Sequence, residues 1–100
     1  MTIFELEFLP SAQKEWDKLA PDLKKQFTKK LRERLSNPRI PASRLHDMPD
    51  CYKIKLRSAG YRLVYQVFDD RIVVTVVAVG KRERNLVYKI AAGRLTPRTP

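Results

Sequence analysis

The chain is poor in the residues that many secreted proteins and metal enzymes depend on, with one cysteine and one histidine in 100 residues. A single cysteine cannot form an internal disulfide, which is typical of cytosolic proteins. No apolar run approaches the roughly 20 residues that span a bilayer, and no basic segment precedes an apolar one at the start. We therefore expect a cytoplasmic protein with neither a membrane span nor a secretory signal.

Acidic residues are also scarce, since 21 Lys and Arg stand against 11 Asp and Glu and the net charge is +10. Such a surplus predicts a polyanionic partner: RNA, DNA or an acidic protein, with a membrane surface disfavoured. A chain of this length suits one domain with its own core. We expect that domain over residues 1–95 and a frayed tail over residues 96–100.

Charged and apolar side chains alternate over residues 51–57 with the period of a β-strand. One face carries the cations Lys53, Lys55 and Arg57, and the other carries Tyr52, Ile54 and Leu56. A turn over residues 58–60 then brings Arg62 near. Lys55 and Arg62 lie on the same face of the sheet only if the numbers of two residues paired across the hairpin add up to an odd number. Either a two-residue loop over 59–60 or a four-residue loop over 58–61 produces such a pairing.

An isolated strand of this kind is most often half-buried with a solvated polar face. Further cations lie elsewhere in this chain, and that favours an anion-binding site on the basic face.

Residues 2–36 predict a strand and an αα-hairpin. Apolar and acidic residues alternate over residues 2–9, as in a strand. Ser11 is a candidate N-cap for a short helix through residue 19. After a turn at residues 20–22, a longer helix reaches Ser36 and buries a stripe of Leu23, Phe27, Leu31 and Leu35.

Residues 39–92 predict an ordered loop (39–50), three antiparallel strands (51–57, 61–68, 71–79) and a short helix (86–92). A tight turn at Asp69-Asp70 pairs Phe68 with Arg71. With this pairing, Ala78 faces the helices. Val73, Val77 and Val79 then form an apolar floor on the basic face, which another part of the chain must cover. The final helix is too short to be stable alone, so we expect it to dock weakly.

These elements predict a small single domain of the α+β class. An N-terminal strand, an αα-hairpin and a three-stranded antiparallel meander complete a four-stranded sheet, followed by a short C-terminal helix.

His46 and Cys51 are the remaining side chains that could bind a metal or act as a nucleophile, and we expect neither role. His46 is alone in a loop without ligand-type spacing, so we expect no metal and no cofactor. Cys51 has no histidine expected beside it, and we interpret it as a small buried side chain.

Several segments together resemble the RelE toxin family. They are CYKIKLRSAGYRLVYQV at 51–67, VGKRER at 79–84 with a following Val-Tyr, Lys-Glu-Trp at 14–16, and Asn-Pro-Arg-Ile at 37–40. The resemblance covers residue 1 to about residue 92 and departs beyond it. It implies a toxin of a toxin–antitoxin pair that cuts mRNA in the ribosomal A site. The implied partners are a RelB-type antitoxin, mRNA and the ribosome through small-subunit rRNA, with operator DNA reached only through the antitoxin complex.

The resemblance also carries functional positions onto this chain. The catalytic positions it implies are Lys53, Lys55, Arg62, Arg82 and Tyr88. Candidate RNA- or ribosome-binding residues are Lys24, Lys25, Lys29, Lys30, Arg32, Arg34, Arg44, His46, Lys81 and Arg84. His46 departs from the nearest members of the family, which carry arginine there in a loop that approaches RNA. For the helix cations, a solvated face is the alternative, and the high net charge favours phosphate contact.

RNA can be cut without metal when its own 2′-hydroxyl attacks the adjacent phosphate. That route needs a base, positive charge for the phosphorane and an acid for the leaving oxygen. We expect no carboxylate on the basic face, so lysine must serve as the base, its pKa lowered by crowding with like charges. We assign Lys55 as base with Lys53 assisting, Arg62 and Arg82 to charge stabilisation, and Tyr88 to stacking. Proton donation by Arg82 stays open.

Two other functions fit parts of this pattern. ParE-like gyrase inhibitors share the scaffold and cut nothing, and a basic RNA- or ribosome-binding module would explain the charge alone. Only an interferase would leave codon-phased cuts in a translated message.

Overall fold

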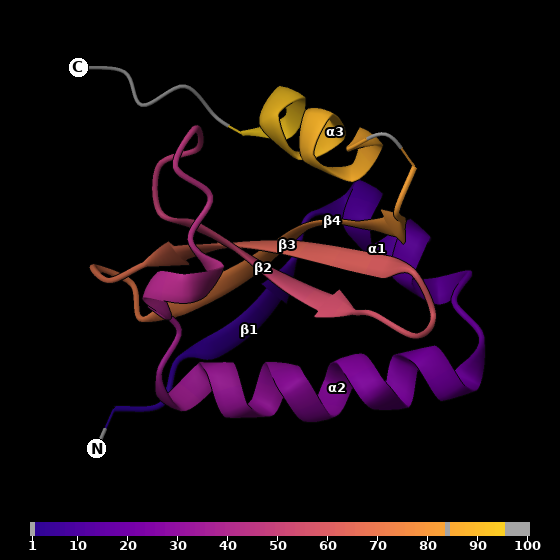
Figure 1. Cartoon of the computed structure of the whole chain (residues 1–100). Coiled ribbons are helices and arrows are strands. Elements are labelled where there is room, and N and C mark those ends of the chain that lie inside the picture. Colours follow the sequence, from indigo (N-terminus) through magenta and orange to yellow (C-terminus); the bar gives the residue numbers. More distant parts are fainter. Residues whose placement is uncertain (1, 84, 96–100) are drawn as a thin grey trace.

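Four strands form one sheet in the computed structural model, which describes residues 2–83 and 85–95 (Figure 1). They are β1 (Glu5–Phe8), β2 (Cys51–Leu56), β3 (Tyr61–Phe68) and β4 (Val73–Lys81), in the spatial order β1-β4-β3-β2. The meander β2-β3-β4 is antiparallel, and β1 joins it parallel to β4. The predicted α+β fold with a four-stranded sheet is confirmed, and β2 is an edge strand.

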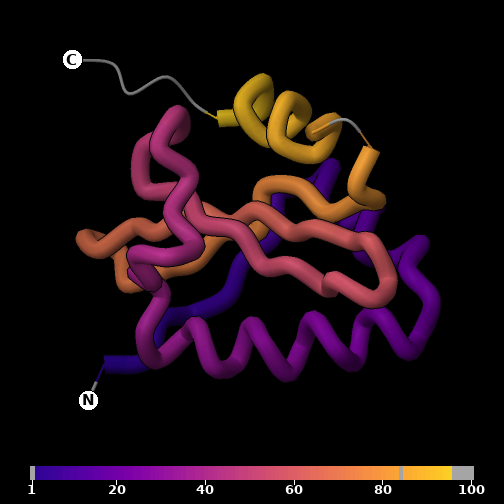
Figure 2. The backbone as a smooth tube through the Cα atoms, in the orientation of Figure 1, coloured from indigo at the N-terminus to yellow at the C-terminus, as the bar shows by residue number. Residues whose placement is uncertain are grey.

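The two faces of the sheet bury separate apolar clusters. Helices α1 (Pro10–Asp17) and α2 (Pro21–Ser36) cover one face, where Phe27, Leu31 and Tyr65 are fully buried. Helix α3 (Leu86–Arg94) and the loop over residues 39–50 lie against the other face, as Figure 2 shows. The second cluster consists of Met48, Cys51, Val64, Val77, Ala78, Val87 and Ala91. No helix within residues 2–83 and 85–95 has the length and apolar character to cross a membrane.

Both N-terminal helices begin at a proline. Helix α1 starts at Pro10 with Leu9 as its N-cap, and α2 starts at Pro21. The expected Ser11 cap is therefore wrong, because proline at the first helical position sets the required φ and lacks only an N–H that would be unpaired anyway. The apolar stripe of α2 is confirmed: Phe27 and Leu31 are buried, and Leu23 and Leu35 pack beside them.

Strand β4 starts two residues later than predicted and continues to Lys81. Phe68 pairs with Val73 rather than Arg71, so a four-residue loop over residues 69–72 replaces the expected tight turn. Ile72 closes that loop in the left-handed region, at φ 55°. Positive φ is rare for a β-branched residue, so no local pattern predicts this conformation at Ile72.

A register shift between Val64 and Tyr65 changes the faces of the end of β4. Because β4 has one extra residue at this point, the Ala78 side chain points into the cluster under α3. The Val79 side chain points into the core under the first two helices. The expected floor is thus wrong at Val79, and Val77 with Ala78 forms it instead.

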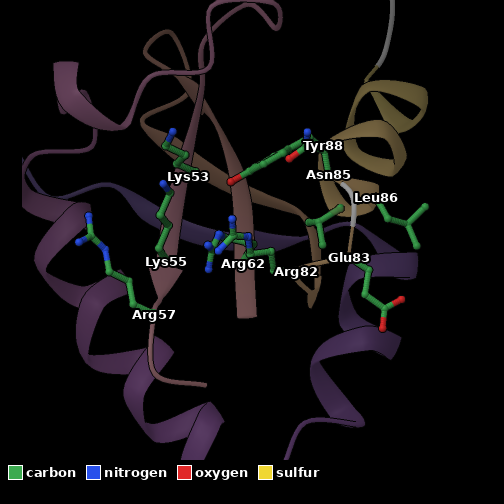
Figure 3. Close-up of a pocket in the computed structure, with 10 residues that line it drawn as sticks. Lys53, Lys55, Arg57, Arg62, Arg82, Glu83, Asn85, Leu86 and Tyr88 are labelled. Carbon is green, nitrogen blue, oxygen red and sulfur yellow. The ribbon is translucent and has the colours of Figure 1, made fainter. Parts of the chain in front are cut away.

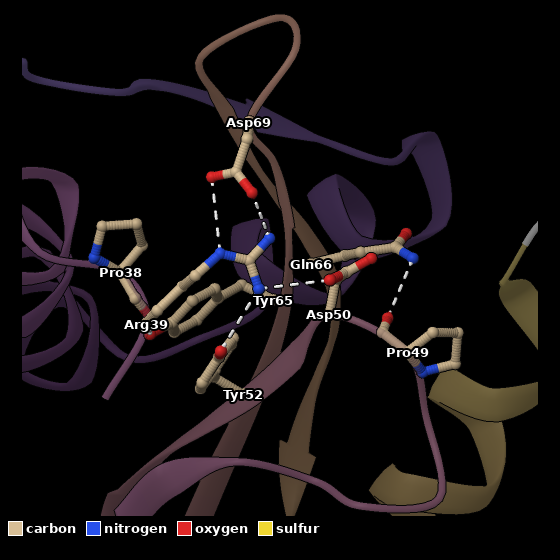
Figure 4. Close-up of polar contacts among 8 residues, drawn as sticks. All are labelled: Pro38, Arg39, Pro49, Asp50, Tyr52, Tyr65, Gln66 and Asp69. Atoms are coloured by element: carbon tan, nitrogen blue, oxygen red, sulfur yellow. Dashed lines mark hydrogen bonds and ion pairs between the residues drawn. The ribbon is translucent and has the colours of Figure 1, made fainter. Parts of the chain in front are cut away.

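Arg39 fixes the start of the 39–50 loop to the sheet (Figure 4). Its guanidinium bonds to Asp50 at 3.1 Å, to the Tyr52 hydroxyl at 3.3 Å and to the carboxylate of Asp69. Met48 is buried and Leu45 packs beside it, so these two side chains anchor the loop to the sheet. The loop therefore holds a defined position next to β2.

The Tyr65 hydroxyl provides a testable contribution to stability. Burial raises the pKa of Tyr65, so the hydroxyl stays protonated and donates to Pro38 O at 2.6 Å, while it accepts from Arg34 at 2.9 Å. We expect Tyr65→Phe to lower the free energy of unfolding by about 1–3 kcal/mol in urea titration. Tyr61→Phe is the control, because the Tyr61 hydroxyl bonds to no other described residue. Equal losses in both variants would contradict this role.

Candidate active site

The β2–β3 hairpin places Lys55 directly opposite Arg62. Paired numbers sum to an odd number, as predicted, so both side chains lie on one face. The connection is a four-residue loop over residues 57–60, one position earlier than the four-residue alternative, and the two-residue alternative is wrong. Gly60 ends the loop at φ 70°, a left-handed conformation that glycine adopts without strain.

A pocket of about 490 Å³ opens on this basic face (Figure 3). All five residues predicted as catalytic line it: Lys53, Lys55, Arg62, Arg82 and Tyr88. The other lining residues are Arg57, Glu83, Asn85, Leu86 and Val87. Strands β2 and β3, the end of β4 and helix α3 thus converge on one cavity.

Arg62 is the buried charge of this pocket, with a relative exposure of 7%. Its Nη1 donates to the carbonyl oxygen of Tyr61 at 3.0 Å, and no carboxylate among the described residues pairs with it. Burying a charge without a partner is costly, and such sites persist where a ligand supplies the counter-charge. The pocket is therefore suited to an anion.

Like-charge crowding acts on the neighbouring lysine. Lys53 is the main cause that lowers the pKa of Lys55, followed by desolvation and then by Arg62, Arg57 and Arg82. A lowered pKa increases the fraction of neutral amine, which is the form that can accept a proton. Burial instead raises the pKa of the Cys51 thiol to about 12, so this side chain is not a thiolate at neutral pH.

Helix α3 forms one wall of the pocket and brings Tyr88 to it. Val87 and Ala91 are buried against the sheet, and α3 continues two residues beyond the predicted end, to Arg94. In Figure 3 the Tyr88 ring extends from α3 toward the lysines of β2. Gly80 allows this close approach, because a Cβ there would lie 3.2 Å from Val87 Cγ2. The helix is thus held by buried contacts, which its length alone did not predict.

Comparison with known proteins places the chain in a family. Residues 6–86 match the family described as ParE toxin of type II toxin–antitoxin system, parDE. The mRNA interferase toxin RelE of Escherichia coli K12 is 58% identical over 90 residues, which cover 90% of this chain and 95% of that protein. The chain belongs to the RelE toxin family.

Solved structures of E. coli RelE share the fold of this RelE-family chain. A doubly substituted RelE in the free state superposes with a TM-score of 0.87 at 54% identity, covering 96% of this chain and all of that one. RelE in the intact E. coli RelBE toxin–antitoxin complex gives 0.78 at 58% identity, covering 81% of this chain and 99% of that one.

Most of the expected RNA- or ribosome-binding cations are exposed in this RelE-family fold. Lys25, Lys29, Lys30 and Arg32 are exposed on α2, Lys24 is half-buried there, and Arg44, His46 and Lys81 are exposed elsewhere. Arg84 lies outside the described residues. These side chains are available to a partner.

Arg34 is the exception and faces inward. It donates to Lys53 O at 3.3 Å, to the Tyr65 hydroxyl at 2.9 Å and to the Ser43 hydroxyl at 3.1 Å. The guanidinium thus joins α2 to the edge of β2, and contact of Arg34 with RNA stays a prediction.

Sequence reasoning missed Glu83, which lines the pocket and corrects the expectation of a basic face without a carboxylate. In Figure 3 its carboxylate points away from the basic side chains. Asn85 and Leu86 were also missed, and the only signal for them is their place between Arg82 and Tyr88. Among the described residues, no three His, Cys, Asp or Glu side chains gather as metal ligands.

Proposed function

We propose that this chain is the toxin of a type II toxin–antitoxin pair and cleaves mRNA in the ribosomal A site. The observation that carries the proposal is the pocket around the buried Arg62. The basic and aromatic side chains that line it with Arg62 are Lys53, Lys55, Arg57, Arg82 and Tyr88. The 58% identity to a protein named mRNA interferase toxin RelE gives this pocket its substrate class.

The proposed chemistry is attack by the RNA's 2′-hydroxyl on the adjacent phosphorus. Lys55, with Lys53 beside it, accepts the hydroxyl proton while the bond from the 2′-oxygen to phosphorus forms. Arg62 and Arg82 stabilise the phosphorane charge, and the bond to the 5′-oxygen breaks to leave a 2′,3′-cyclic phosphate. Arg82 is the candidate donor of the proton that the leaving oxygen takes, and Tyr88 stacks on a base.

Translation of a defined message in vitro, with primer extension to map the ends, tests this function. We expect cuts in phase with the codons. A ParE-like inhibitor of a protein target would leave the message intact, and a basic ribosome-binding module would halt ribosomes without new ends. Either of those results would overturn the proposal.

The same face is the proposed binding surface of an antitoxin. The net charge of +10 favours an acidic partner, and the apolar groups Val77 and Ala78 lie under α3 beside the pocket. We expect an acidic, partly helical segment of a RelB-type antitoxin to cover this side and contact Lys53, Lys55 or Arg82. The segment would inhibit by occupying the pocket and neutralising its charge.

The role of Lys55 as base predicts a particular pH dependence. Cleavage should rise with pH as the Lys55 amine loses its proton, with an inflection below the ordinary lysine pKa. Lys53→Met removes the largest cause of that lowering, so the pKa should rise and the inflection should move to higher pH. Single-turnover rates between pH 6 and 10 measure it, with Lys14→Met on α1 as the control. An unmoved inflection in Lys53→Met would rule out Lys55 as the titrating base.

A further inference from the structure

Two side chains form hydrogen bonds with the backbone of β4 at its outer edge, in the part of the strand that β1 does not reach. Strand β1 pairs with β4 only as far as Phe8 opposite Val76, after which the chain turns into α1. Beyond that point, Val79 N donates to Glu15 Oε1 at 3.1 Å and Val77 O accepts from Arg94 Nη1 at 3.0 Å. Glu15 and Arg94 therefore satisfy backbone groups that a longer β1 would have paired.

The same two side chains bind each other in a bidentate ion pair. Arg94 Nη1 lies 2.7 Å from Glu15 Oε1, and Nη2 lies 3.0 Å from Oε2. Both side chains are mostly shielded, with relative exposures of 23% and 28%, so solvent screens the pair less than a fully exposed one. The pair ties α3 to α1 across the edge of the sheet.

Arg94 is the last docking contact on one face of α3, where Ile90 also packs against the buried cluster. Val87, Ala91 and Arg94 follow at spacings of four and three, which places them on one side of a helix. Nine residues are too few for a helix to be stable alone, and Gly93 weakens its last turn further. The position of α3 on the sheet therefore depends on these contacts.

We infer that the Glu15–Arg94 pair is a positioning device that holds Tyr88 over the Lys55–Arg62 pocket. Neither residue lines that pocket, so the pair acts only through α3. Tyr88 follows the docked Val87 directly and stands six residues before Arg94, about 9 Å along the helix axis. This inference rests on the proposed cleavage function for its activity readout and on the geometry of α3 for its structural one.

Arg94→Met tests the inference, because methionine keeps much of the apolar stem and removes the ion pair. We expect faster hydrogen exchange of the α3 amides, unchanged exchange in β2 and β3, and a fall in single-turnover cleavage of about 10- to 100-fold. Arg94→Lys should recover part of the rate through a single charged contact. Lys89→Met, an exposed position on α3, is the matched control and should change neither readout.

A background variant separates positioning from general damage. In a Tyr88→Ala chain, Arg94→Met should cause little further loss, because the ring that the pair positions is already absent. An equal loss in both backgrounds, or unchanged exchange of α3, would overturn the inference. Hydrogen exchange can be measured without any cleavage. If the unmodified chain leaves ribosome-bound message intact, the proposed function is overturned, and the exchange of the α3 amides still tests whether the pair anchors this helix.

Discussion

Replacing Arg62 by methionine is expected to reduce cleavage of ribosome-bound message by about 10²- to 10³-fold. A loss of this size is usual when a preorganised group that stabilises a transition-state oxyanion is removed. Arg62 is buried in the pocket without a described carboxylate partner, so its charge is available to the phosphorane. Methionine keeps much of the apolar stem and relieves crowding with Lys55 and Arg82. We therefore expect the free energy of unfolding to stay the same or rise while activity falls.

The matched control is Arg71→Met, an exposed arginine stacked on Phe68 away from the pocket. It loses the same charge and should cleave at the unmodified rate. Arg62→Lys should recover only part of the activity, because an ammonium lacks the planar fork that binds two phosphate oxygens. Cleavage by Arg62→Met within threefold of the unmodified chain would contradict the assigned role.

Cleavage of a free oligonucleotide is expected to be slower than cleavage on a programmed ribosome by at least about 10³-fold. The proposed base is a lysine, which is mostly protonated at neutral pH, and in-line attack needs a geometry that stacked RNA does not adopt. Correct positioning can lower a barrier by about 7–11 kcal/mol, more than enough to offset a weak base. The ribosome would supply that positioning by holding the message.

Charge reversal on α2 tests how the ribosome is engaged. We expect Lys25→Glu with Lys29→Glu to weaken ribosome binding and to leave the slow rate on free RNA unchanged, because both side chains are exposed and outside the catalytic pocket. Lys14→Glu on α1 with Lys18→Glu at its C-cap changes the net charge equally at another exposed place. Equal weakening in both double variants would mean that bulk charge, rather than α2, attracts the ribosome.

The features that sequence alone predicted well are those governed by local periodicity. Alternation over residues 51–57 fixed which side chains of β2 face the core, and the parity of the hairpin placed Arg62 beside Lys55. The stripe through Phe27 and Leu31 located α2 and its buried face. In each case one repeated spacing decides the outcome, and no distant contact competes with it.

The features that were missed depend on contacts between distant segments. One extra residue on β4 exchanged the faces of Ala78 and Val79, and no local pattern marks it. Arg34 looked like another exposed cation of α2, yet it turns inward because Tyr65 and Lys53 offer acceptors there. The Glu15–Arg94 pair joins residues 79 positions apart, so neither alone signals it.

Cleavage through the RNA's own 2′-hydroxyl can be tested on a ribosome programmed with a message that lacks a single 2′-hydroxyl. The A-site codon would carry 2′-deoxyribose at the nucleotide whose hydroxyl is proposed to attack, and primer extension would map the ends. Attack by the 2′-hydroxyl predicts a cut with a 2′,3′-cyclic phosphate in the unmodified message and none at the modified position. Equal cutting of both messages would contradict it, because the attacking oxygen would then have to come from elsewhere.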